Sequence, residues 1–211
     1  MNRRHALLQL AALAAVPALP GLAWAKDPFV VLNPPQQPDD PARIEVVEFF
    51  HYGCPHCRNF DPLVKAWAAK APADVAFRAV PAIWNNAQLG GLARLYYAAQ
   101  VSGDLDRVHS QVFDAVQDEK RPLHTEDGAR DWITGKVADP AKFMEAYKSF
   151  GVNSMLQRAD QIARAMKIQG VPTMVVDGKY VTSASIAGSH DEALKVVDQL
   201  IERARKERAA K

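Results

Sequence analysis

The stretch Arg43–Cys57, RIEVVEFFHYGCPHC, joins a nearly continuous apolar run to two closely spaced cysteines. The run through Phe50 is rich in β-branched and aromatic residues, which is typical of a strand buried on both faces of a sheet. Apolar residues then recur at helical spacing to about Lys70, and residues 75–80 predict a second strand that Pro81 closes. This strand–loop–helix–strand order favours a parallel or mixed α/β sheet, with the cysteines where the first strand ends.

The segment after Pro81 has little strand character. Apolar stripes at helical spacing are expected over 89–96, 105–116 and 143–147, followed by a helix from Asn153 to Met166. Asp139-Pro140 predicts the start of the third stripe, as cap and first helical residue, and Gly151 predicts its end.

Strand character returns after Gly170-Val171-Pro172. Residues 173–176 predict a strand, and Asp177-Gly178 predicts a hairpin turn into a second short strand at 179–181. A final helix is expected from about His190. The whole order predicts a compact α/β fold with a helical insertion.

The N-terminus has the pattern of an export signal. Residues 1–25 combine Arg3 and Arg4, an apolar run over 6–19 and a small-x-small cleavage pattern at 23–25. A transmembrane anchor is the alternative, but prolines and a glycine leave fewer than the ~20 apolar residues that a span needs. We therefore expect residues 1–25 to be a cleaved signal peptide and the mature protein to occupy an oxidising compartment. The proline-rich stretch 26–42 should be extended, with a short edge strand at 29–32.

The composition describes an ordinary globular protein. The chain has 211 residues, of which 48% are hydrophobic, and 26 basic residues stand against 24 acidic ones. Removal of residues 1–25 would leave no net formal charge. Disorder and nucleic-acid binding are not expected from this balance. Two cysteines are too few for a disulfide-stapled miniprotein or a four-cysteine zinc site.

The cysteine spacing predicts redox chemistry. Pro55 at the first helical position places the sulfur of Cys54 at a helix N-terminus, where unpaired N–H groups favour a thiolate. His56 adds a donor or a positive charge, and Cys57 lies one turn further in, where it should be more buried. A stabilised thiolate stabilises the reduced form, so the Cys54–Cys57 disulfide should be a strong oxidant.

Three other interpretations of the two cysteines have less support from the sequence. A c-type haem site needs histidine directly after the second cysteine, where Arg58 stands. A metal site needs two more ligands, and taking them from His51 and His56 would strain one short loop. A purely structural disulfide that closes so short a ring removes little entropy from the unfolded chain, so it stabilises the fold only slightly.

These residues resemble those of the DsbA family of periplasmic thiol:disulfide oxidoreductases. The resemblance rests on Val47–Cys57, the helical insertion and Gly170–Thr173, and it covers essentially the whole mature chain. It implies a thioredoxin fold formed by residues 26–85 and 159–211, interrupted by a helical domain over 86–158.

The same resemblance implies roles for individual residues. Cys54 would be the exposed, attacking sulfur, Cys57 its buried partner, and Pro55 and His56 would tune the redox potential. Val171 and Pro172, the latter a cis-proline facing the cysteines, would line the site where an extended substrate lies. A proline that merely opens a strand is the alternative for Val171-Pro172 taken alone.

Glu48 interrupts the first strand as an acid, six residues before Cys54. In the family an acid here lies beneath the site and assists proton transfer, usually paired with a lysine on the neighbouring strand. That strand offers only Arg78 as a basic residue. A solvated strand end is the alternative place for Glu48. The remaining histidines show no partner pattern and are interpreted as surface or packing residues: His51, His109, His124 and His190.

The sequence thus predicts a periplasmic oxidase that donates the Cys54–Cys57 disulfide to newly exported proteins. The family implies reoxidation by a DsbB-like, quinone-linked inner-membrane protein; we expect no cofactor and a monomer. An exported reductase or isomerase is a first alternative, although no dimerisation segment is evident before Arg43. A non-catalytic thioredoxin-like binding or chaperone module is the second.

Overall fold

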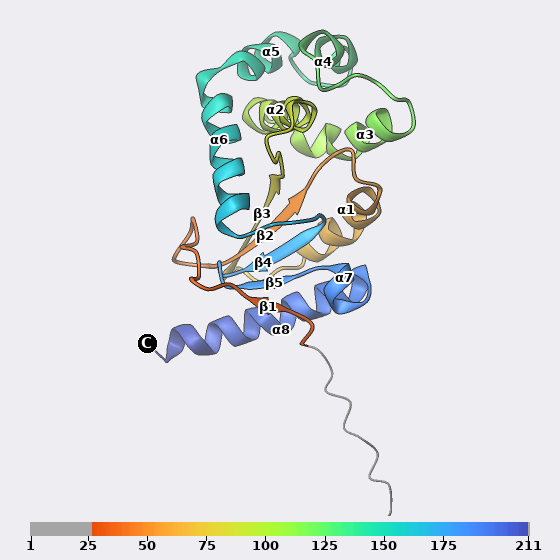
Figure 1. Cartoon of the computed structure of the whole chain (residues 1–211). Helices are drawn as coiled ribbons and strands as arrows, with labels where there is room; N and C mark the ends of the chain where they lie inside the picture. The colour runs from red at the N-terminus through yellow and green to blue at the C-terminus, as the bar shows by residue number, and fades with distance from the viewer. Residues whose placement is uncertain (1–26, 211) are drawn as a thin grey trace, which may run out of the picture.

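The computed structural model describes residues 27–210, so the predicted signal peptide lies outside the described residues (Figure 1). The strands are β1 (Val30–Val31), β2 (Ile44–Phe50), β3 (Val75–Pro81), β4 (Thr173–Val176) and β5 (Tyr180–Thr182). The helices are α1 (Pro55–Ala68), α2 (Ala87–Ser102), α3 (Leu105–Gln117), α4 (Glu126–Ile133), α5 (Pro140–Lys148), α6 (Phe150–Ala165), α7 (Ala184–Ala187) and α8 (His190–Ala209). Within 27–210 no helix is long and apolar enough to cross a membrane.

The five strands form one mixed sheet in the order β1-β5-β4-β2-β3. β2 runs parallel to β3 and antiparallel to β4, and β1 pairs antiparallel with β5 at the edge. All seven residues of β2 are buried, which explains why its sequence lacks a polar/apolar alternation. The mixed sheet and the short edge strand agree with the sequence prediction.

Two apolar cores lie on opposite faces of this sheet. Alternate residues of β2 point to opposite faces: Val46 packs with α1 and α8, whereas Val47 and Phe49 pack with the helices between β3 and β4. In Figure 1, α8 runs below the sheet and the group α2–α6 lies above it. The sheet therefore holds the β2–α1 junction between two helical layers.

The helical group differs from the prediction in its boundaries. Gly151 does not end α5, because Ser149 already caps the next helix by accepting from the backbone N–H of Val152. α6 consequently begins at Phe150, three residues before the predicted start at Asn153. The apolar pattern of the sequence did not predict α4 or the four-residue α7. The division expected at residue 158 falls inside α6, which continues to Ala165.

The predicted β4–β5 hairpin is present and also holds the lead-in segment. Asp177 and Gly178 both have left-handed backbone conformations, with φ of 54° and 61°, as the predicted two-residue turn requires. A Cβ on Gly178 would lie 2.0 Å from the carbonyl oxygen of Gln36, so a side chain does not fit there. The N–H of Gln36 donates to the Gly178 carbonyl at 2.8 Å, which ties the proline-rich segment to the sheet.

Candidate active site

Cys54 is the N-cap of α1, and Pro55 occupies the first helical position. The sulfur of Cys54 accepts a hydrogen bond from the backbone N–H of Cys57 at 3.3 Å, in the way that a serine or aspartate side chain caps a helix. Both cysteines are free thiols in this structure. Cys54 is 7% exposed and Cys57 0%, so the sulfur expected to be exposed is itself largely covered, although it is the more accessible of the two.

This position lowers the pKa of Cys54 to about 6, from an ordinary value of 9.0. The largest cause is the hydrogen bond from the Cys57 side chain; burial opposes it, and the backbone N–H groups of Cys57 and His56 add to it. The charge of the His56 imidazole contributes less than these bonds. The helix N-terminus therefore favours the thiolate mainly through its amides and the neighbouring thiol.

The second sulfur has the opposite preference. Burial, the hydrogen bond to Cys54 and the negative charge of that sulfur all raise the pKa of Cys57. The reduced pair thus carries one negative charge, on Cys54, and one proton, on Cys57.

The loop before β4 brings Val171 against the reactive sulfur. The thiol of Cys54 lies 3.5 Å from the carbonyl oxygen of Val171, although the two residues are 117 positions apart in the chain. The Val171-Pro172 peptide bond is cis. The hydroxyl of Thr173 donates to the Gly170 carbonyl at 2.7 Å and closes the loop on itself. Cys54 and the Val171-Pro172 segment therefore share one small surface.

Glu48 lies in the interior and not at a solvated strand end. It is 5% exposed, and its burial, followed by the negative charge of Asp61, raises its pKa to about 8; the charge of Lys65 opposes this. No ion pair reaches Glu48 within residues 27–210. A carboxyl without a counter-charge at such a place holds its proton near neutral pH.

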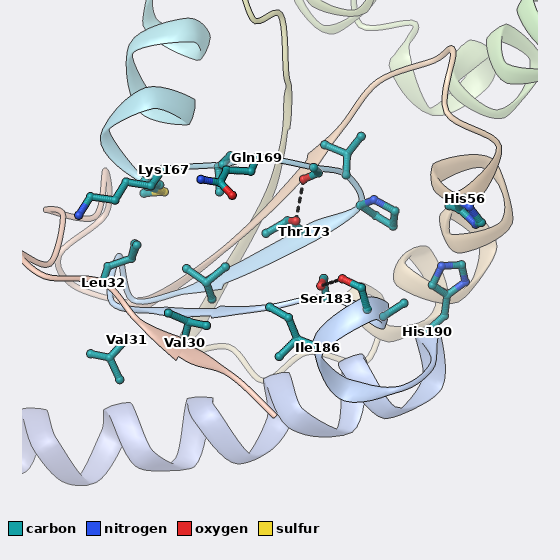
Figure 2. Close-up of a pocket in the computed structure, with 18 of the residues that line it drawn as sticks. Val30, Val31, Leu32, His56, Lys167, Gln169, Thr173, Ser183, Ile186 and His190 are labelled. Carbon is teal, nitrogen blue, oxygen red and sulfur yellow. Dashed lines mark hydrogen bonds between the residues drawn. The ribbon is translucent and has the colours of Figure 1, made fainter. Parts of the chain in front are cut away.

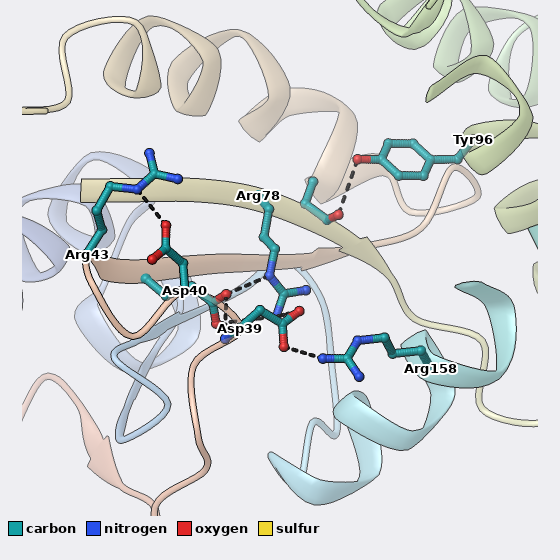
Figure 3. Close-up of polar contacts among 8 residues, drawn as sticks. Asp39, Asp40, Arg43, Arg78, Tyr96 and Arg158 are labelled. Carbon is teal, nitrogen blue, oxygen red and sulfur yellow. Dashed lines mark hydrogen bonds and ion pairs between the residues drawn. The ribbon is translucent and has the colours of Figure 1, made fainter. Parts of the chain in front are cut away.

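Arg78 does not replace the lysine that the family resemblance leads one to expect. In the β2–β3 register Arg78 lies opposite Val47, and Glu48 lies opposite Ala79. Because neighbouring residues of a strand point to opposite faces, Arg78 is turned away from Glu48. It donates instead to Glu45 at 2.9 Å and pairs with Asp39 at 3.3 Å, in the network of Figure 3.

Tyr52, His109 and Asp61 form a buried polar chain that the sequence did not predict. The Tyr52 hydroxyl lies 2.7 Å from Nδ1 of His109, and Nε2 of His109 lies 3.3 Å from Asp61. Asp61 also accepts from the hydroxyl of Ser110 at 2.6 Å and from the ammonium of Lys65 at 3.1 Å. His109 therefore links the loop before Cys54 to α1 and α3, beyond the packing role expected from sequence.

Replacing Asp61 with asparagine should destabilise the protein by about 1–3 kcal/mol at pH 7. Burial opposes ionisation, but bonds from His109 and Ser110 hold the pKa of Asp61 at about 2, below its ordinary 3.8. Because the folded-state pKa is depressed, this stabilisation is present above pH 4 and is lost as the pH falls toward about 2. Urea unfolding at pH 7 and pH 3 measures the difference.

The matched control for Asp61 is Asp114, whose carboxylate pairs with Arg58 at 2.8 Å on the surface and is 55% exposed. Asp114→Asn should change the free energy of unfolding by less than about 1 kcal/mol. Equal effects of the two substitutions would contradict a stabilising role for the buried chain.

An open groove begins beside the active-site loop. Its volume is about 760 Å³, within the range of pockets that bind small molecules (Figure 2). His56 and His190 both line the groove at one end, and their ring centroids are 6.5 Å apart. Apolar side chains form most of the wall: Val30, Val31, Leu32, Met166, Ile168, Val171, Pro172, Val181 and Ile186.

These features define a class of protein. A C-x-x-C pair at a helix N-terminus, a stabilised thiolate and a cis-proline loop against the sulfur, on a sheet of this topology, are the parts of a thioredoxin-fold thiol:disulfide oxidoreductase. The helical group α2–α6 is inserted between β3 and β4 of that fold.

Comparisons with known proteins give the family. The model of the DSBA-like thioredoxin domain matches residues 67–195. The thiol:disulfide interchange protein DsbA of Bordetella parapertussis is 42% identical over 203 residues, covering 95% of this chain and 96% of that protein. DsbA of Pseudomonas aeruginosa is 39% identical over 213 residues, covering 96% and 97%, respectively. The crystal structure of P. aeruginosa DsbA has a TM-score of 0.83 at 38% identity, over 87% of this chain and 95% of that structure.

The chain belongs to the DsbA family, and it is a thiol:disulfide interchange protein with a thioredoxin fold. The fold class and the family resemblance drawn from the sequence are confirmed.

Proposed function

We propose that this protein is a periplasmic disulfide donor. Its oxidised form would pass the Cys54–Cys57 disulfide to reduced, newly exported proteins. The observation that carries this proposal is the asymmetry of the reduced pair, in which the pKa of Cys54 is lowered to about 6 and that of Cys57 is raised. A stable Cys54 thiolate favours the reduced protein and therefore favours giving the disulfide away.

The reaction proceeds by two exchanges. A substrate thiolate attacks Cys54, a mixed disulfide forms, and the Cys54–Cys57 bond breaks with its electron pair on Cys57. Cys57 takes up a proton, for which the protonated carboxyl of Glu48 is the nearby donor that we propose. A second substrate thiolate then attacks the mixed disulfide and leaves Cys54 as thiolate. The substrate loses two electrons, and the cysteine pair gains them.

The surrounding residues would serve these two exchanges. Pro55 fixes the start of α1 and so the amides that face Cys54. His56, exposed beside the pair, adds positive charge when protonated and has a minor tuning role. Val171 and Pro172 would hold an extended substrate by its backbone beside the sulfur, since Val171 already lies within contact of Cys54.

The proposal also covers the compartment and the partners of the protein. The relatives named DsbA and the export-signal pattern of residues 1–25 support a periplasmic protein. Each turnover leaves the pair reduced, so a membrane oxidase of the DsbB type would restore the disulfide. We further propose that the protein acts as a monomer and needs no bound cofactor.

The proposal predicts a strongly oxidising pair with an acidic thiol. In glutathione buffers the pair should remain largely reduced even where oxidised glutathione dominates, scored by mass after acid quenching. The rate at which reduced Cys54 reacts with iodoacetamide should rise with pH around a midpoint near 6, because the thiolate reacts and its pKa is lowered to about 6.

A pair that stays oxidised in a large excess of reduced glutathione would contradict the proposal. A reductase or a structural disulfide would then be the better assignment. A thiol midpoint near the ordinary value of 9.0 would remove the stabilised thiolate on which the proposal depends.

A further inference from the structure

The described residues that line the groove beside Cys54 include basic side chains but no acidic ones. Among the described residues that line it there is no aspartate or glutamate, whereas one lysine and two histidines are present: Lys167, His56 and His190. The other polar groups there are neutral side chains and backbone. A bound segment therefore meets only apolar surface, neutral donors and acceptors, and groups that are positive or can become so.

Lys167 is a cation with no carboxylate partner in the part of the chain that the structure describes. Within residues 27–210 no acidic group lies within ion-pair distance of its ammonium, which donates to the carbonyl of Asn33 at 3.2 Å. On the preceding helix α6, in contrast, Arg158 and Arg164 each pair with a carboxylate, Asp39 and Asp160. Of these three basic residues, only the one that faces the groove has no ion-pair partner among the described residues.

The positive groups stand at opposite ends of the groove. Figure 2 shows Lys167 at one end and His56 with His190 at the other, and Val30 and Ile186 lie between them. The His56 end adjoins Cys54, two residues earlier on the same turn. A substrate segment that starts at Cys54 and follows the groove therefore runs over apolar side chains towards the ammonium of Lys167.

We propose that the groove selects reduced segments in which apolar residues beside the reacting cysteine lead to an aspartate or glutamate that pairs with Lys167. This inference rests on the disulfide-donor function proposed above and names the substrates that it favours. The carboxylate supplies the counter-charge that the groove lacks. A lysine at the same place in the substrate would meet a like charge beside apolar surface.

The expected selectivity is modest, because Lys167 is exposed and solvent screens the pair. A partly exposed ion pair corresponds to a rate advantage of about two- to fivefold. The advantage should disappear at about 0.5 M salt, where screening is strong. A preference that came only from apolar contact would not weaken with salt.

The test uses the oxidised, purified exported protein and synthetic dithiol peptides. Each peptide carries the same cysteines and the same apolar segment, with glutamate, glutamine or lysine placed about three to seven residues from the reacting cysteine, on either side. The measured quantity is the second-order rate of peptide oxidation, followed by acid quenching and mass. Glutamate should react fastest and lysine slowest at the matching position, and the three should react equally elsewhere.

Two variants assign the preference to Lys167. Lys167→Glu should reverse the order of the glutamate and lysine peptides, and Lys167→Gln should make their rates equal. Lys142→Glu is the matched control, because the Lys142 ammonium also donates to a backbone carbonyl, that of Ser102 at 3.3 Å, but lies on α5 away from the groove. This control should keep the order seen in the unchanged protein.

The outcomes separate the two proposals. If the peptides are oxidised at equal rates at every position, or if Lys167→Glu keeps the original order, the inference is wrong and the disulfide-donor function stands. If no peptide is oxidised at all, the proposed function itself fails.

Discussion

Replacing Cys54 with serine should abolish disulfide transfer, lowering kcat/KM for a dithiol peptide by at least about a thousandfold. The sulfur of Cys54 lies at the N-cap of α1 and adjoins the Val171 carbonyl. An incoming substrate therefore reaches this sulfur before that of Cys57. Serine keeps the cap, because its oxygen also accepts from backbone N–H groups, but it forms no disulfide. The fold should therefore survive while transfer is lost, as circular dichroism and the peptide assay can show together.

Cys57→Ser is the matched control for this substitution. It leaves the Cys54 thiolate free to attack a substrate disulfide, but it removes the sulfur that would release the product. The mixed disulfide through Cys54 should therefore accumulate and be visible by mass, whereas Cys54→Ser should form none. A mixed disulfide through Cys57 in the Cys54→Ser variant, with none in the Cys57→Ser variant, would reverse the roles that we assign.

Much of this arrangement could be predicted from local sequence. The apolar run of β2, the proline after Cys54 and the Asp177-Gly178 turn each determine backbone structure over a few residues, and the fold has these features at those places. The direction of the Cys54 pKa shift also follows locally, because the groups that lower it are the side chain of Cys57 and the backbone amides of Cys57 and His56.

The sequence predictions for His109 and Arg78 were incomplete because both residues make contacts between distant segments of the chain. His109 looked unpartnered because Tyr52 and Asp61, with which it bonds, are far from it in the chain and meet it only when α3 packs beside α1. Arg78 looked like a candidate partner for Glu48 until the β2–β3 register turned it to the other face. A shift of one residue in that register would have exchanged the two faces, and sequence alone gave no means to exclude it.

The register has a further consequence, since Glu48 lies in the core and forms no ion pair with any of the described residues. Its folded-state pKa of about 8 lies above the ordinary 4.5, so the folded state holds a proton that the unfolded chain releases. The contribution of Glu48 to stability should therefore fall as the pH rises from about 4.5 to 8, by at most about 5 kcal/mol, whereas the lowered pKa of Cys54 adds stability to the reduced protein above about pH 6. Glu48→Gln keeps the shape and removes the ionisation. It should match the unchanged protein in stability near pH 4.5 and exceed it increasingly up to pH 8.

Urea unfolding of the reduced Glu48→Gln variant and of the reduced unchanged protein across this pH range would measure the difference in their free energies of unfolding. Glu45→Gln is the matched control, because Glu45 lies on the same strand, is buried and has Arg78 as its partner at 2.9 Å. Its removal leaves a partly buried guanidinium with fewer acceptors, so Glu45→Gln should destabilise the protein where Glu48→Gln stabilises it. If Glu48→Gln instead lowered stability at pH 8, Glu48 would be ionised and paired in the folded state. It would then not be the proton donor that we propose for Cys57.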